Sequence, residues 1–109
     1  MAYNEAIHER VKTIVETWNN TAHKKMFGGI CHLMEGNMFC GLLKDDLILR
    51  LGESAAKEAL TLPHVKPFDI TGKAMKGWVM VEPDGYESDA RLEEWLLSAR
   101  RFVETLPAK

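Results

Sequence analysis

Apolar side chains recur at three- and four-residue spacings near the N-terminus, which predicts an amphipathic helix from about Asn4 to Trp18. Asn4 is the expected N-cap, and the turn-favouring stretch "WNNTAH" is expected to end the helix. The same spacing places His8 on the polar side, which we expect to face solvent. The apolar stripe of this helix consists of Ala6, Ile7, Val11, Ile14, Val15 and Trp18.

From His23 to Leu51, short apolar runs separated by glycine predict antiparallel strands. Gly36-Asn37 is expected to form the turn of one hairpin, with glycine first as a type II′ turn prefers. Asp45-Asp46 is expected to form the turn of the next. These turns would pair Cys31 with Leu42, and Leu42 with Leu49.

Because side chains alternate between the two faces of a strand, these pairings assign each residue to a face. The expected core face carries Cys31, Leu33, Cys40, Leu42, Leu49 and Leu51. The expected outer face carries His32, Met34, Phe39, Gly41, Leu43, Ile48 and Arg50.

The rest of the chain predicts two further helices and two further strands. A short helix is expected from about Glu53 to Leu60, followed by strands at "KPFDI" and "GWVMVEP". The last helix is expected within "ESDARLEEWLLSARRFVETL", with Ser88 or Asp89 as its N-cap. This order of elements predicts an α+β fold of two layers, in which N-terminal, middle and C-terminal helices pack on an antiparallel β-sheet.

Composition narrows the class of protein further. The length of 109 residues predicts one domain, residues 1–109, and 46% hydrophobic and 28% charged residues are ordinary for a soluble domain. A formal net charge of -2 lacks the overall basic excess of autonomous nucleic-acid binders. The start of the chain is too charged for a signal peptide, and no apolar run is long enough to span a bilayer. With only two cysteines, we expect a cytoplasmic protein with free thiols.

The stretch "HKKMFGGICHLMEGNMFCG" groups lysines, glycines, cysteines and histidines, but it predicts no catalytic, cofactor or metal site. A phosphate-binding loop needs its lysine after the glycines, at the start of a helix. Cys31 and Cys40 fall on the expected core face, where cysteine packs as a small hydrophobic residue. The four histidines are dispersed along the sequence, without the spacing of zinc ligands. We therefore expect this stretch to be a structural part of the sheet.

Two groups of residues retain functional interest. Lys24, Lys25, Lys73 and Lys76 occur in two similar segments, "KKMFGGI" and "KAMKGWV", and would form a basic patch if these segments lie close together. The second group is an apolar part of the expected outer face, which a second subunit would cover in a homodimer. It consists of Met34, Phe39, Leu43 and Ile48.

Taken together, "KKMFGG", the "GNMFCG" hairpin and "GKAMKGWV" resemble the N-terminal domain of the TfoX (Sxy) family, bacterial proteins linked to the control of competence genes. The resemblance extends over nearly the whole chain. It implies a fold similar to that of secretion chaperones, a cytoplasmic location and no established cofactor or catalytic residue. Longer relatives carry a C-terminal helical domain. Because the chain ends at Lys109, just after the last expected helix, we expect a stand-alone form without that domain.

Three functions remain open from the sequence. The first is a non-enzymatic protein-interaction module, linked to regulation of competence or transcription by the family resemblance. The second is a nucleic-acid-binding accessory protein that uses Lys24, Lys25, Lys73 and Lys76. The third is an enzyme or small-ligand binder that uses Cys31, His32 or Arg50.

Overall fold

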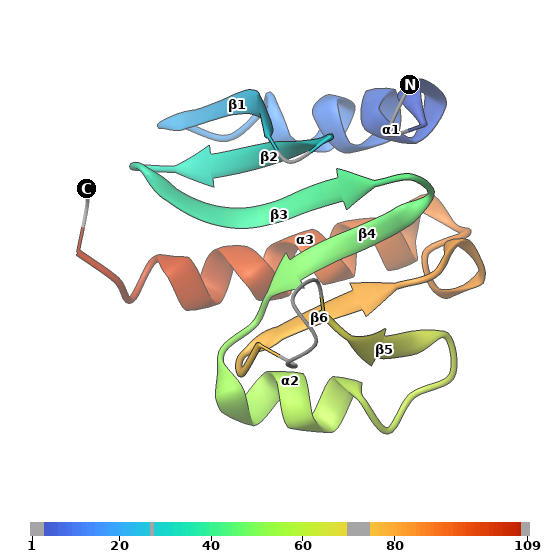
Figure 1. Cartoon of the computed structure of the whole chain (residues 1–109). Helices are drawn as coiled ribbons and strands as arrows, with labels where there is room; N and C mark the ends of the chain where they lie inside the picture. The colour runs from blue at the N-terminus through green and yellow to red at the C-terminus, as the bar shows by residue number, and fades with distance from the viewer. Residues whose placement is uncertain (1–3, 27, 70–74, 108–109) are drawn as a thin grey trace.

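A computed structural model describes residues 4–26, 28–69 and 75–107 of the chain, and it contains a six-stranded antiparallel sheet with three α-helices (Figure 1). The strand order is β1-β2-β3-β4-β6-β5. The α+β prediction is therefore confirmed. The elements are α1 (Glu5–Val15), β1 (Thr21–Met26), β2 (Gly29–Met34), β3 (Asn37–Leu43), β4 (Asp46–Arg50), α2 (Glu53–Ala59), β5 (Val65–Pro67), β6 (Trp78–Val81), the 3₁₀ turn η1 (Pro83–Gly85) and α3 (Asp89–Val103).

The predicted helix starts are confirmed by their caps. The side-chain oxygen of Asn4 accepts hydrogen bonds from the amides of Ala6 at 2.9 Å and Ile7 at 3.3 Å. The hydroxyl of Ser88 accepts one from the amide of Arg91 at 3.1 Å, so Ser88 and not Asp89 is the N-cap of α3. Each cap satisfies amides that have no partner inside the helix.

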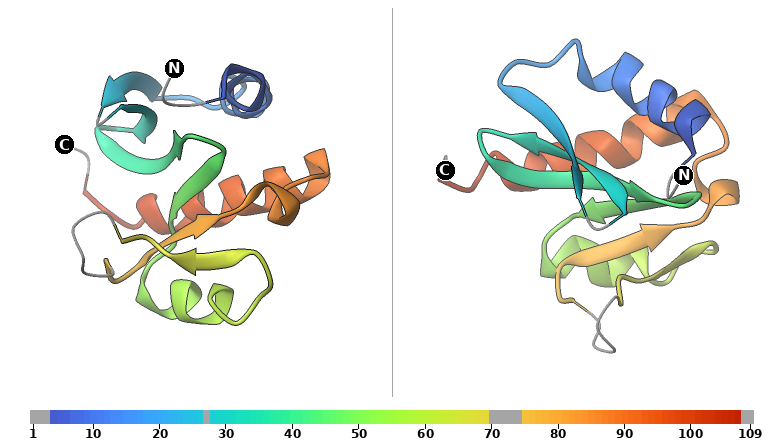
Figure 2. Two further views of the ribbon diagram at one scale, coloured as in Figure 1. Left: turned by 45° about the vertical axis from the view of Figure 1, so that its right-hand side comes forward. Right: turned by 45° about the horizontal axis from the view of Figure 1, so that its top comes forward.

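The three helices and one face of the sheet form a single main core. Val11 and Val15 of α1 belong to it, as do Ala56 and Ala59 of α2. In α3, the periodic apolar stripe supplies five buried residues, which are Leu92, Trp95, Leu96, Ala99 and Val103. Figure 2 shows how strongly the sheet twists, with α1 beside its β1–β2 end and α2 beside its β5–β6 end.

The first hairpin differs from the prediction in its turn. The turn lies at Glu35-Gly36, where φ is 51° and 84°, and it pairs Met34 with Asn37. Two consecutive residues with positive φ are typical of a type I′ turn, which matches the twist of the flanking strands. The expected Gly36-Asn37 turn is therefore wrong.

A β-bulge changes the register again between His32 and Leu33, and beyond it Cys31 pairs with Gly41 instead of Leu42. A shift by one residue moves every side chain of the strand to the other face. The expected positions of Cys31 and Leu33 on the core face are wrong. Ile30, His32 and Met34 lie there instead, and Phe39, also expected on the outer face, is fully buried in the main core.

The second hairpin turns at Lys44-Asp45, so Leu42 pairs with Leu47 and not with the expected Leu49. The predicted pairing of these strands is therefore wrong by two residues. Because side chains alternate between the faces of a strand, a shift of two residues leaves each side chain on its predicted face. The core positions predicted for Cys40, Leu42, Leu49 and Leu51 are therefore correct.

The apolar outer face expected at Met34, Phe39, Leu43 and Ile48 is not an exposed surface. Met34 and Phe39 belong to the main core. On the opposite face, Ile48 is buried in a small cluster with Phe68 and Met80, against which Leu43 is partly buried. Since the chain itself covers most of these side chains, they no longer require a second subunit to cover them.

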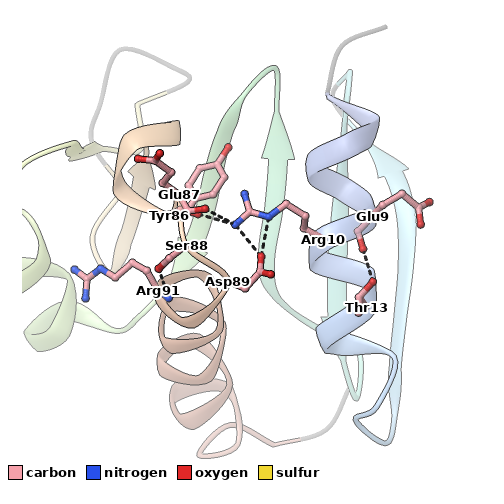
Figure 3. A network of polar contacts seen from close by, with 8 residues as sticks. All are labelled: Glu9, Arg10, Thr13, Tyr86, Glu87, Ser88, Asp89 and Arg91. Carbon is pink, nitrogen blue, oxygen red and sulfur yellow. Dashed lines mark hydrogen bonds and ion pairs between the residues drawn. The ribbon is translucent and has the colours of Figure 1, made fainter.

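Arg10 braces α1 against the start of α3 (Figure 3). Its Nη2 atom donates to the carbonyl oxygens of Tyr86 and Glu87, each at 3.0 Å, and its Nε atom donates to the carboxylate of Asp89 at 3.2 Å. The hydroxyl of Tyr86 donates to the carbonyl oxygen of Asp45. This network joins α1, the β3–β4 turn and α3, which are far apart in the sequence.

Candidate functional site

The lysines predicted to form a basic patch are separated in space. Lys24 and Lys25 lie on β1, whereas Lys76 precedes β6, and β2, β3 and β4 lie between these strands (Figure 1). Four steps between neighbouring strands correspond to roughly 19 Å. The Nζ atom of Lys76 lies 4.0 Å from a carboxylate oxygen of Glu53, and Lys73 lies outside the described residues. The expected clustering of Lys24 and Lys25 with Lys76 is therefore wrong.

An apolar groove of about 550 Å³ lies between α2 and the segment that enters β6. Ala56, Pro67 and Trp78 contribute to its lining, and Leu60 and Met75 expose 38% and 43% of their surface. Its charged lining residues are Glu53, Lys57 and Lys76. The sequence did not predict this groove, because α2 and the approach to β6 are far apart in the chain.

The backbone holds the two sides of this groove together. The amides of Leu51 and Gly52, just before α2, both donate to the carbonyl oxygen of Gly77, at 2.8 and 3.1 Å. Gly52 and Gly77 have φ values of 87° and 86°, which side chains other than glycine rarely adopt. These bonds hold the backbone at Gly77, on one side of the groove, against the start of α2 on the other side.

The two cysteines are free and buried, and they lie on opposite faces of the sheet. Burial raises the pKa of both thiols, and the nearby Lys24 offsets only part of this effect at Cys31. A thiol nucleophile requires the opposite shift. Neither cysteine has the environment of a reactive group.

Three histidines come together between α1 and the β1–β2 strands, a cluster that the sequence did not predict. The Nε2 atoms of His8 and His32 lie 3.2 Å apart, within hydrogen-bond distance. The ring of His23 lies 5.5 Å from that of His8 and 5.3 Å from that of His32, between centroids. The expected solvent-facing position of His8 is wrong, because only 8% of its surface is exposed. A prediction of the β1–β2 register, which pairs His23 with His32, would have revealed two members of this cluster.

His8 and His32 have the properties of neutral imidazoles. Burial lowers the pKa of His32 to about 3, with smaller contributions from His8, His23 and Lys12. Burial, together with His23 and Lys12, also lowers the pKa of His8, while Glu9 and Glu5 act in the opposite direction. Among the described residues, no three histidine, cysteine, aspartate or glutamate side chains are placed to hold a metal ion.

None of the helices in the described ranges has the length and apolar character needed to cross a membrane. Neither a curated protein nor a solved structure matches the chain. The family model of the TfoX N-terminal domain matches residues 13–103, which include the β-hairpins, the α2 groove and the whole of α3. The chain therefore belongs to the TfoX N-terminal domain family.

Proposed function

We propose that this chain is a non-enzymatic protein-interaction domain that binds an apolar segment of a partner protein in the α2 groove. The observation that carries the proposal is the exposure of Leu60 and Met75 beside an apolar groove. Apolar surface that the chain leaves open to solvent is typical of interaction sites.

The charged residues that line the groove indicate which side chains a bound segment would carry. The carboxylate of Glu53 lies within ion-pair distance of Lys76, whereas Lys57 belongs to no ion pair among the described residues. The groove therefore presents one uncompensated positive charge, although the whole chain has a net charge of -2. We expect the bound segment to combine apolar side chains with an acidic residue that faces Lys57.

Membership of the family supports a role for this interaction in gene regulation in the bacterial cytoplasm, including the control of competence genes. Direct nucleic-acid binding receives less support, because the structure separates Lys24 and Lys25 from Lys76. The absence of a reactive environment at Cys31 and Cys40 is in keeping with a non-catalytic role.

The test is an affinity purification from native lysate with the wild-type chain and two matched variants. Leu60→Glu places a charge in the groove, whereas Leu62→Glu makes the same change at an equally exposed leucine that does not line it. We expect wild type and Leu62→Glu to retain the same nuclease-resistant protein partner, and Leu60→Glu to lose at least about 90% of it. Thermal melts of the three proteins establish that each is folded.

The role of charge is tested with the partner recovered in this way. Lys57→Glu is expected to weaken its binding about tenfold, because it reverses the uncompensated charge at the groove. Equal recovery of all partners by Leu60→Glu and wild type would overturn the groove proposal. Loss of every partner on nuclease treatment would instead favour nucleic-acid binding.

A further inference from the structure

The histidine cluster forms part of the contact between α1 and the edge of the sheet. His8 comes from α1, His23 from the edge strand β1 and His32 from β2. His8 and His32 are 8% and 2% exposed, so the hydrogen bond between their rings is shielded from water. Phe39 of β3 packs against the ring of His32, with centroids 6.4 Å apart.

The bond between His8 and His32 depends on their protonation state. A neutral imidazole has one nitrogen that donates and one that accepts, whereas a protonated imidazole has two donors. With Nε2 atoms 3.2 Å apart, one ring must therefore present an unprotonated nitrogen to the other. If both rings were charged, two N–H groups and two positive charges would face each other at this distance.

Among the residues that the structure describes, the charged groups near this pair favour added positive charge only in part. On α1, Lys12 adds positive charge, while Glu5 and Glu9 act in favour of charge only on His8. Glu9 also lies 3.6 Å from Lys12, which partly offsets its effect. From β1, the ring of His23 lies close to both rings and lowers the pKa of each. Glu16 lines the adjacent cleft together with His23 and His32, but its side chain is exposed to solvent.

We propose that the cluster of His8, His23 and His32 is a proton-operated latch that holds α1 and the edge strand β1 on the rest of the sheet. Protonation of both rings leaves no acceptor nitrogen between them, which breaks the His8–His32 hydrogen bond and separates α1 and β1 from β2. Opening begins there because β1 pairs only with β2 within the described sheet, whereas β3, β4 and β6 each have strand neighbours on both sides. The α3-covered centre of the sheet stays folded at this stage. This latch is independent of the α2 groove, at the other end of the sheet (Figure 2).

The experiment is amide hydrogen exchange of the full chain, resolved by residue and measured from pH 7 to pH 3 with a chelator present. We expect protection of α1 and β1 to fall between the ordinary histidine pKa of 6.5 and the value of about 3 for His32. Protection of α3 and β4 should persist to lower pH. The opening constant of α1 should rise about tenfold per pH unit for each proton taken up.

Matched variants assign this effect to the cluster. His32→Gln keeps a polar side chain that does not titrate, and it should lower the number of protons taken up on opening by about one. His23→Gln, at the exposed member of the cluster, should move the opening to lower pH because it removes a repelling charge. His64→Asn changes the histidine outside the cluster, at a position with φ of 67° that asparagine tolerates, and should behave as wild type.

Loss of protection in α1 and α3 at the same pH would overturn the latch. So would an unchanged pH dependence of α1 opening in His23→Gln, the variant least able to disturb the core. If His32→Gln does not fold, the His23→Gln and His64→Asn comparison still decides the question.

Discussion

A side chain at Gly29 would collide with the carbonyl oxygen of Leu42: a Cβ atom there would lie 2.2 Å from it. Gly29 belongs to the "KKMFGG" motif, and Leu42 lies on the neighbouring strand β3. The close approach explains this glycine in structural terms, without a ligand or a reaction. Gly41 is similar, because a Cβ atom there would lie 2.9 Å from the carbonyl oxygen of Ile30.

We therefore expect Gly29→Ala to lower the free energy of unfolding by about 3 kcal/mol, since the atom it meets is backbone and cannot rotate away. Urea denaturation followed by circular dichroism measures this difference. Lys24→Ala, at an exposed position of the adjacent strand, is the control and should change the free energy by less than about 0.5 kcal/mol. Equal stabilities of Gly29→Ala and wild type would contradict the close approach of β2 and β3.

Loss of the Arg10 brace should destabilise the protein. Arg10→Ala leaves the carbonyl oxygens of Tyr86 and Glu87 without this donor, and we expect a loss of about 1–2 kcal/mol in the free energy of unfolding. Asp89→Asn should cost less than about 0.5 kcal/mol, because the Asp89 side chain is 88% exposed and its ion pair is screened by water. Thermal and urea denaturation of both variants test this order. A larger effect at Asp89 would mean that the ion pair, and not the carbonyl contacts, dominates the brace.

Tyr86 should make the protein sensitive to alkali. Burial, followed by the charges of Asp45 and Asp46, raises the pKa of Tyr86 to about 12, above the ordinary value of 10. The folded state then binds more protons than the unfolded state between these values, so stability is complete below pH 10 and falls as pH rises toward 12. Tyr86→Phe should lose about 1 kcal/mol at pH 7 and show a weaker decline above pH 10, by about one proton. Urea denaturation at several pH values measures both effects.

The control for Tyr86 is Tyr3→Phe, which changes the other tyrosine of the chain. It leaves the ionisation of Tyr86 visible in the phenolate absorbance, at about pH 12. Ionisation of that remaining tyrosine near pH 10 would show that Tyr86 is not buried as described.

The thiols should be unreactive in the folded protein. Because Cys31 and Cys40 are buried and their pKa values are raised, a disulfide reagent should label both roughly 100-fold more slowly than in the urea-unfolded chain. Single Cys31→Ala and Cys40→Ala variants identify which thiol reacts. Labelling of either cysteine in the folded state as fast as in the unfolded chain would instead support an enzyme that uses a cysteine thiol.

Local sequence signals determined the elements, the two helix caps and the family of this protein. Periodic apolar positions place α1 and α3, and Asn4 and Ser88 cap them as their side chains predict. These features depend on residues a few positions apart, which a sequence displays directly. β2, β3, β4 and β6 follow in the same way from apolar runs between glycines and turns. β1 is different, because it begins at Thr21, inside the stretch expected to end the first helix, and β5 ends at Pro67, before the expected end of "KPFDI".

Only the tertiary structure decided which residues face each other. The Glu35-Gly36 turn and the bulge at His32 and Leu33 set the register of β2. This register differs from the predicted one by one residue at Cys31 and His32, so each of the two side chains lies on the face predicted for the other. Strand order separated Lys24 from Lys76, and packing brought His8 to His32 and α2 to the start of β6. Such contacts join distant parts of the chain. Their geometry depends on how the whole core packs, and no local pattern of residues encodes it.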